Sequence, residues 1–286
     1  MPGTAQTIAL KDGRALGFAE FGVPNGKPVM YFHGHPGARI EWPVFGDDEA
    51  ARELGIRVIA VDRPGHGLSS LQPGRRLLDW PDDVVALANH LSLERFGVLG
   101  LSGGGPYALA CAYRVPDRLA GAVAVSGMGP AEAPGATQGL SWTYPGKRAL
   151  MRKMFLKLTE LGLRKQPERF VEQTIETFHG PDLELIKGDA RIQQGIVEVF
   201  AEAFRAGVNG PHYDAGLYSR PWQFQLQDIA MAVHLWHGMQ DENVLPSVAK
   251  HVADSLRDCR STFLDTEGHI SLARRRARDY LGAFLA

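Results

Sequence analysis

The sequence is poor in cysteine, in long apolar runs and in charge of one sign, and each shortage excludes a class of protein. Its 286 residues include two cysteines, Cys111 and Cys259, too few for a disulfide framework or a structural zinc site. No apolar run approaches the roughly 18 residues that cross a bilayer. Lysine and arginine total 31 against 32 aspartate and glutamate, which argues against nucleic acid or a membrane as a partner.

The amino terminus also lacks a targeting pattern. Its first residues, MPGTAQTIALKDGR, contain no basic stretch followed by an apolar one, so they do not read as a secretory signal. We therefore expect a cytoplasmic protein. A hydrophobic fraction of 44% excludes intrinsic disorder, because such a chain buries enough apolar surface to offset its conformational entropy. The length provides a core for one large domain with an inserted segment.

Short apolar runs alternate with helical patterns through the first 127 residues. The runs Val29–Phe32 and Val58–Val61 are apolar at successive positions, which is typical of strands covered on both faces. This rhythm predicts a doubly wound α/β domain. Over the whole chain the predicted strands are Thr7–Leu10, Ala15–Phe21, Pro28–His33, Arg57–Val61, Phe96–Leu101, Gly121–Ser126, Ala232–Trp236 and Thr262–Asp265.

A different pattern begins near Met128 and continues to about Asp228. There, amphipathic segments separated by proline and glycine predict helices. They cover Lys147–Leu163, Glu168–Phe178 and Leu183–Phe204. The β/α rhythm then returns, with helices predicted over Pro246–Leu256 and Ile270–Phe284. We expect residues 1–127 and 229–286 to form one α/β core, and residues 128–228 to form a helical cap, or lid, over its sheet.

The strongest local signal is Gly100-Leu101-Ser102-Gly103-Gly104, which lies between a predicted strand and a predicted helix. A serine on a sharp strand-to-helix turn has a strained backbone, and flanking glycines let neighbouring chain approach closely. A glycine-rich turn without chemistry is the plainer interpretation of the bare motif. Its position between strand and helix favours Ser102 as a catalytic nucleophile.

A nucleophilic serine needs a base and an acid that orients the base. His269 follows the last predicted strand, and Asp241 follows the one before it. Both therefore lie at the carboxyl edge of the sheet, where Ser102 also lies. The chain order of serine, aspartate and histidine fits this arrangement. Glu242 is the nearest competitor for the role of the acid.

The loop His33-Gly34-His35-Pro36-Gly37 follows another predicted strand. Such a loop directs a backbone N–H group towards an acyl oxygen, together with the N–H of the residue after the nucleophile. We assign these oxyanion donors to His35 and Gly103. The side chain of His35 either points into the site or fills the loop. His33 and His35 alone do not indicate a metal site, because no further ligands follow at a suitable spacing.

With these motifs the sequence resembles the cap-bearing members of the α/β-hydrolase fold superfamily, as a serine hydrolase or esterase-like protein. The resemblance extends through the segments His33–Gly37, Asp62–Ser69, Gly100–Gly104, His237–Asp241 and Gly268–His269. It implies an eight-stranded, mostly parallel sheet flanked by helices, with a substrate pocket between sheet and cap. It also implies Ser102, Asp241 and His269 as catalytic residues, and no cofactor or metal.

At two positions the sequence differs from specialised classes of enzymes with this fold. Epoxide hydrolases and haloalkane dehalogenases of this fold have aspartate at the elbow, where this chain has Ser102. Prolyl aminopeptidases resemble it at the loop before Gly37, but they typically carry tryptophan after the nucleophile, where this chain has Gly103. Both comparisons favour a general serine hydrolase over these specialised classes.

We therefore expect a cofactor-independent serine hydrolase whose small-molecule substrate is a carboxylic ester with a small to medium apolar acyl group. Amides, lactones, thioesters and carbon–carbon bonds beside a ketone remain open, because the same residues cleave all of them. Two other classes also remain: a ligand receptor with a slow or vestigial triad, and a lyase or perhydrolase using the same site. Aromatic and methionine side chains of the expected cap either line an acyl pocket or pack it onto the sheet; they are Met151, Met154, Phe155, Phe178, Phe200, Phe204, Tyr218, Trp222 and Phe224.

Overall fold

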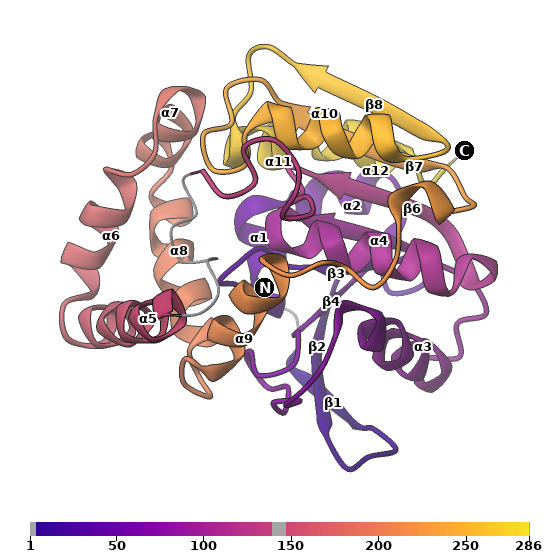
Figure 1. Cartoon of the computed structure of the whole chain (residues 1–286), viewed down its shortest axis with the longest axis horizontal. Coiled ribbons are helices and arrows are strands. Elements are labelled where there is room, and N and C mark those ends of the chain that lie inside the picture. The colour runs from indigo at the N-terminus through magenta and orange to yellow at the C-terminus, as the bar shows by residue number, and fades with distance from the viewer. Residues whose placement is uncertain (1–3, 139–146, 286) are drawn as a thin grey trace.

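The computed structural model of the protein describes residues 4–138 and 147–285, and it contains an eight-stranded sheet (Figure 1). The strand order is β1-β2-β4-β3-β5-β6-β7-β8, and β2 runs antiparallel to both of its neighbours while all remaining pairs are parallel. The strands are β1 (Gln6–Ala9), β2 (Ala15–Gly22), β3 (Lys27–Phe32), β4 (Ile56–Val61), β5 (Phe96–Leu101), β6 (Leu119–Val125), β7 (Val233–Gly238) and β8 (Cys259–Leu264). The predicted eight-stranded, mostly parallel sheet is confirmed.

The central strands are apolar at successive positions because each face of the sheet packs against its own layer of helices. In β3, Met30 and Phe32 belong to one hydrophobic cluster, whereas Val29 and Tyr31 belong to the other. One cluster includes side chains of α3 (Trp80–His90), α4 (Gly105–Arg114) and α10 (Pro246–Ser255). The other includes those of α1 (Trp42–Phe45), α2 (Asp48–Glu53), α11 (His269–Arg275) and α12 (Ala277–Gly282).

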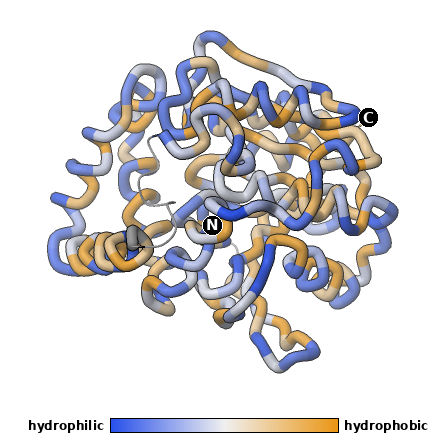
Figure 2. The backbone as a smooth tube through the Cα atoms, in the orientation of Figure 1, coloured by the Kyte–Doolittle hydropathy of each residue, from blue (hydrophilic) through white to orange (hydrophobic). Residues whose placement is uncertain are grey.

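Hydrophobic and hydrophilic residues alternate along several of the covering helices (Figure 2), such as α3, in which Asp82 is exposed while Val84 and Leu87 are buried. The helix α4 is different, because its residues from Gly105 to Ala112 are all buried. Cys111, on α4, is fully buried in the first cluster. Within residues 4–138 and 147–285, no helix is both long and apolar enough to cross a bilayer.

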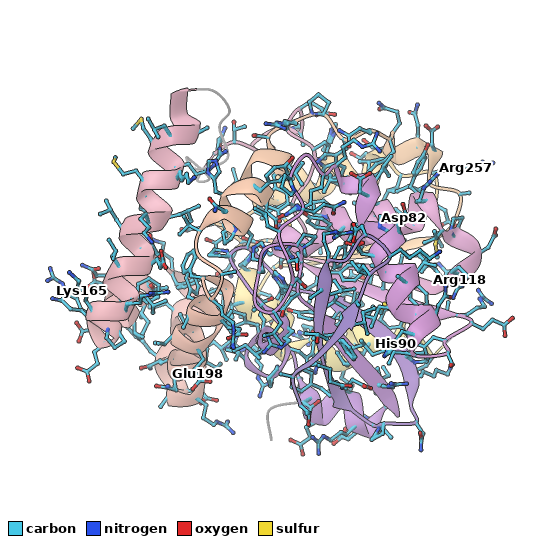
Figure 3. All side chains as sticks on the ribbon, turned by 90° about the horizontal axis from the view of Figure 1, so that it is seen from below. Asp82, His90, Arg118, Lys165, Glu198 and Arg257 are labelled. Carbon is cyan, nitrogen blue, oxygen red and sulfur yellow. The ribbon has the colours of Figure 1, made fainter. Side chains whose placement is uncertain are left out.

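Five helices follow one another between β6 and β7 among the described residues; we call them the inserted helices. They are α5 (Lys147–Lys165), α6 (Pro167–Ile175), α7 (Gly180–Gly188), α8 (Ala190–Ala203) and α9 (Asn209–Tyr218). In Figure 1, α5 to α8 lie together to one side of the sheet, and α9 lies between them and the core. Figure 3 shows the same division, with Lys165 and Glu198 towards one end of the molecule and Asp82, His90, Arg118 and Arg257 towards the other.

The prediction of one continuous helix over Leu183–Phe204 is wrong, because the chain forms two helices there. Asp189 separates them with an extended backbone, and its side chain accepts a hydrogen bond from the N–H of Arg191. A capping aspartate after Gly188 therefore ends α7 and begins α8. The helix predicted over Ile270–Phe284 is likewise divided, into α11 and α12, at Arg276.

Candidate active site

The strand order reverses beside β3 and β5, and open α/β sheets place their sites at the carboxyl ends of such strands. Ser102 directly follows β5 and has a φ of +53°, a strained value for a residue with a Cβ atom. Gly100 and Gly104 make this turn possible. A Cβ on Gly100 would collide with the carbonyl of Gly104, and one on Gly104 would collide with that of Phe32. The turn presents Ser102 at the end of the sheet.

Asp241 and His269 meet at the carboxyl ends of β7 and β8. The Nδ1 atom of His269 lies 2.7 Å from Oδ2 of Asp241. The other oxygen of Asp241 accepts hydrogen bonds from the N–H groups of Asn243 and Val244, both at 2.9 Å. Asp241 is 2% exposed and His269 is 6% exposed, so water competes little for this hydrogen bond. Its geometry fixes the imidazole with Nδ1 protonated and Nε2 available to a reactant.

Charges around His269 favour its protonated form. Burial lowers the pKa of His269, but the charge and hydrogen bond of Asp241 raise it, and Asp182 and Glu41 raise it further. The net result is a pKa above the usual 6.5. An imidazole that gains a proton readily is suited to act as a general base and to remain stable as an imidazolium.

Glu242, the alternative acid, is placed differently. Its side chain is 69% exposed, and its carboxylate lies 3.8 Å from Nε2 of His179. Of the two neighbouring acidic residues, Asp241 is therefore the one whose carboxylate is hydrogen-bonded to His269.

The loop after β3 is fixed by a buried carboxyl that the sequence analysis missed. Oε1 of Glu41 accepts hydrogen bonds from the N–H of Gly34 and the hydroxyl of Tyr31, both at 2.6 Å. Glu41 is 2% exposed, and burial raises its pKa to about 6. Its only sequence signal is its place four residues after Gly37, in a segment otherwise typical of a loop followed by a short helix.

Beneath the same loop lies a second buried carboxylate, Asp214 of α9. Its Oδ2 accepts a hydrogen bond from Nε of Arg63 at 2.7 Å, and its Oδ1 accepts from the Tyr107 hydroxyl at 2.7 Å and from Arg75. Burial raises the pKa of Asp214, but Arg75 and Arg63 lower it more, so the net pKa is well below its usual value. The group is a fully buried ion network that joins an inserted helix to the core.

This network holds the backbone at the site. The guanidinium of Arg63 donates hydrogen bonds to the carbonyls of His33 and Gly34, the second at 2.8 Å. Tyr218, one turn after Asp214 on α9, donates from its hydroxyl to the Gly103 carbonyl at 3.0 Å. The two segments that carry His35 and Gly103 are therefore tied to α9.

His35 itself lies between the two segments. A Cβ on Gly103 would lie 2.7 Å from the Cβ of His35, so the two assigned oxyanion residues are neighbours. The imidazole of His35 packs edge-on against Tyr218, with ring centroids 5.4 Å apart, and its Nδ1 lies 4.0 Å from Asp214. The side chain of His35 thus belongs to the buried network, and the residue also lines the cleft described below.

The histidines do not suit a metal ion. The group in the described residues that comes nearest to a metal-ligand set is His35, His66 and Asp214. Arg63 and Arg75 already bind both oxygens of Asp214, and two guanidinium groups repel a further cation. His33 is also engaged, because its Nε2 accepts from the N–H of Arg63 at 3.2 Å.

A cleft of about 1220 Å³ opens between the inserted helices and the end of the sheet. Ser102, His269, His35 and Glu41 lie on its inner wall. Its outer walls are mainly apolar. They include five of the residues that the sequence analysis considered for an acyl pocket, namely Met151, Phe155, Phe178, Phe200 and Phe204. Trp222 and Phe224 instead stack on one another, with ring centroids 5.7 Å apart, and pack into the core.

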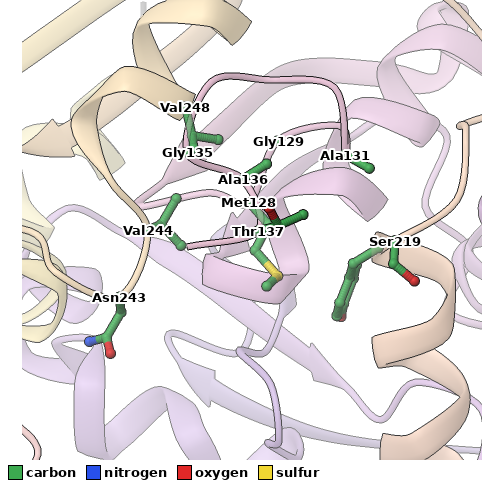
Figure 4. A pocket seen from close by; sticks show the side chains of 11 residues that line it. Met128, Gly129, Ala131, Gly135, Ala136, Thr137, Ser219, Asn243, Val244 and Val248 are labelled. Carbon is green, nitrogen blue, oxygen red and sulfur yellow. The ribbon is translucent and has the colours of Figure 1, made fainter. Parts of the chain in front are cut away.

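A second hollow, lined by Met128, Ser219 and Val248 among others, has a volume of about 20 Å³ (Figure 4). It holds little more than one water molecule. Of the two, the cleft beside Ser102 is the one that accommodates an organic substrate.

Comparison with known proteins agrees with this architecture. A family model described as "alpha/beta hydrolase fold" matches residues 27–273. The chain is 29% identical over 248 residues to a non-heme chloroperoxidase of Streptomyces lividans, covering 83% of each chain. It is 27% identical to a bifunctional esterase/perhydrolase of Acinetobacter calcoaceticus, covering 84% of this chain and 83% of that one. An esterase structure from Rhodococcus sp. superposes with a TM-score of 0.68 at 20% identity, covering 99% and 97% of the two chains.

The chain therefore belongs to the α/β-hydrolase fold family. Hydrolase activity is the class of function that this membership supports.

Proposed function

We propose that the protein is a cofactor-independent serine hydrolase that cleaves carboxylic esters with apolar acyl groups. Ser102 is the nucleophile, His269 the general base and Asp241 the acid that orients it. The observation that carries the proposal is the 2.7 Å hydrogen bond between Asp241 and His269, beside a strained serine in one cleft. Neither a ligand-binding protein nor a structural protein requires this combination.

In the proposed reaction, Oγ of Ser102 attacks the ester carbonyl while Nε2 of His269 takes the hydroxyl proton. Asp241 stabilises the imidazolium that forms. The backbone N–H groups of His35 and Gly103 bind the oxyanion, and each such donor contributes about 3 kcal/mol in comparable sites. His269 then protonates the departing alcohol, leaving an acyl group on Ser102. Water activated by His269 releases the acid and restores the serine.

The preference for apolar acyl groups rests on the cleft. Its volume of about 1220 Å³ exceeds that of most pockets for drug-sized ligands, so it admits acyl groups larger than the small to medium ones expected from the sequence. Met151, Phe155 and Leu158 of α5 line it and are also about 60% exposed, which places apolar surface at its mouth. In this proposal the inserted helices act as a cap that sets substrate choice.

Turnover of a series of p-nitrophenyl esters from acetate to decanoate tests the proposal. We expect kcat/KM to rise with chain length, a burst of p-nitrophenol before steady state, and no turnover by Ser102→Ala. Gln223→Met serves as the control, because Gln223 is exposed and its side-chain amide donates to the Pro221 carbonyl. Equal turnover by wild type and Ser102→Ala would refute the assignment.

Perhydrolysis is a second candidate, favoured by the two relatives named for chloroperoxidase and perhydrolase activity. Hydrogen peroxide would replace water in attacking the acyl group on Ser102, and the products would be a peracid and the free serine. Peracid formation from an ester and hydrogen peroxide, lost in Ser102→Ala, would support it. Ester hydrolysis without peracid would leave hydrolysis as the sole reaction.

A further inference from the structure

The first turn of α7 contacts the backbone segment that carries His269. The carboxylate of Asp182 accepts hydrogen bonds from three successive N–H groups, those of His269 at 2.8 Å, Ile270 at 3.0 Å and Ser271 at 2.8 Å. Asp182 is 4% exposed. A single carboxylate of the inserted helices thus binds the whole first turn of α11.

This arrangement replaces the usual cap of a helix. His269 is the first residue of α11, and Gly268 before it has no side chain with which to accept the free N–H groups. A Cβ on Gly268 would lie 2.7 Å from the Asp182 carboxylate. Glycine is therefore the residue that lets a carboxylate from another part of the chain approach the helix end. The negative charge also lies favourably at the positive end of α11.

We propose that Asp182 is a positioning residue for the catalytic base: it fixes the backbone of His269 and holds a negative charge beside its imidazole. This inference rests on the proposed role of His269. Asp241 orients the ring from its Nδ1 side, whereas Asp182 fixes the chain from which the ring projects. Through Asp182, the inserted helices then help to position the catalytic base, in addition to forming part of the cleft wall.

Asp182 lies a few residues after chain that lines the cleft. Thr177 and Phe178, a few residues before it, line the cleft. Phe178 is followed by Gly180, where α7 begins. A substrate that packs against this segment therefore contacts the same stretch of chain that holds α11.

Four titratable groups lie around His269, three of them carboxyl groups. Asp241 follows β7, Glu41 lies in the short helix after the β3 loop, Asp182 lies on α7, and the buried imidazole of His237 lies at the end of β7, with Nε2 3.5 Å from Asp241. The three carboxyl groups raise the pKa of His269, although burial lowers it. Removing the charge of Asp182 alone should therefore make the imidazole easier to deprotonate.

Asp182→Asn is the direct test, because asparagine keeps one acceptor oxygen and loses the charge. We expect kcat to fall roughly 10- to 100-fold, since a small displacement of a catalytic group costs that much. We expect KM to change little, because Asp182 does not line the cleft. The acid limb of kcat/KM should move about half a pH unit lower. A residue that served stability alone would not move this limb.

Asp189→Asn is the matched control. It makes the same exchange of a charged cap for a neutral one at the start of the neighbouring α8, and the Asp189 side chain bonds to Arg191 rather than to α11. Asp182→Glu is the second variant, which keeps the charge if Asp182→Asn does not fold. We expect Asp182→Glu to have a lower kcat than the wild type. The acid limb of its kcat/KM profile should lie at the same pH as in the wild type, because the charge is kept.

Melting temperature and labelling of Ser102 by a fluorophosphonate accompany each variant. A folded Asp182→Asn that matched Asp189→Asn in kcat and pH profile would overturn the inference. So would an Asp182→Glu whose acid limb shifted as far as that of the asparagine variant. A wild type that fluorophosphonate does not label would instead refute the proposed function, so the two failures are distinguishable.

Discussion

Nδ1 of His269 lies 2.7 Å from Oδ2 of Asp241, and the second carboxylate oxygen is already held by two backbone N–H groups. Asp241 therefore has a single orientation in which it can select the tautomer of His269. In Asp241→Asn the amide can present an N–H where an acceptor is required. We predict a loss in kcat on the order of 10⁴-fold, measured with an activated ester.

Glu242→Gln is the control for this prediction, because Glu242 is exposed and pairs with His179. Its kcat should equal that of the wild type. A large loss in Glu242→Gln together with a small one in Asp241→Asn would reverse the assignment of the acid.

The pH dependence of kcat/KM reports the protonation of His269. Only the neutral imidazole can take a proton from Ser102, and the pKa of His269 is raised above 6.5. Activity should therefore rise with pH, with a midpoint above 6.5. A midpoint clearly below 6.5 would mean that burial outweighs the neighbouring carboxylates.

Glu41 should affect stability in a pH-dependent way. Its pKa is 4.5 in a model compound and about 6 in the fold, so the native state holds a proton that the unfolded state releases between these values. The stability that the protonated Glu41 contributes to the fold is therefore fully present below pH 4.5, and it is lost as the pH rises through 6. Glutamine stays neutral throughout. Relative to wild type, Glu41→Gln should gain about 2 kcal/mol in free energy of unfolding between pH 4.5 and 7.

Urea unfolding at several pH values measures this difference. A difference between Glu41→Gln and wild type that stays constant from pH 4.5 to 7 would show that the carboxyl does not titrate in that range.

Asp214→Asn should destabilise the whole protein. The change leaves the buried guanidinium groups of Arg63 and Arg75 without their common counter-charge. Breaking one partner of a buried ion network costs about 3–5 kcal/mol. We expect this loss in urea unfolding at pH 7. Asp228→Asn changes an exposed carboxylate in the segment between α9 and β7, and this control should unfold like the wild type.

The local sequence predicted the parts of the fold that depend on neighbours in the chain. The eight strands lie close to the predicted ranges. In the central strands, such as β3 and β4, burial on both faces leaves successive apolar residues, a pattern that can be recognised within six residues. Ser102 was indicated by glycines that its own turn requires. The order and spacing of Asp241 and His269 followed from strand ends that meet at one edge of the sheet.

The contributions of the inserted helices could not be predicted in this way. Asp182 and Asp214 look like ordinary polar residues of helices, and nothing near them in sequence shows that they are buried. Their partners, α11 and Arg63, lie more than 80 residues away. The helix α9 was not predicted at all, because its sequence, NGPHYDAGLY, contains glycines and a proline. Its stability comes from packing and from the ion network.

The most direct test of the account is the intact mass of wild type and Ser102→Ala after exposure to a small fluorophosphonate. An activated serine beside His269 should react once per chain in the wild type and not at all in Ser102→Ala. That result would establish Ser102 as the nucleophile. A folded wild type that remains unlabelled would contradict the central claim and favour a ligand-binding role for the cleft.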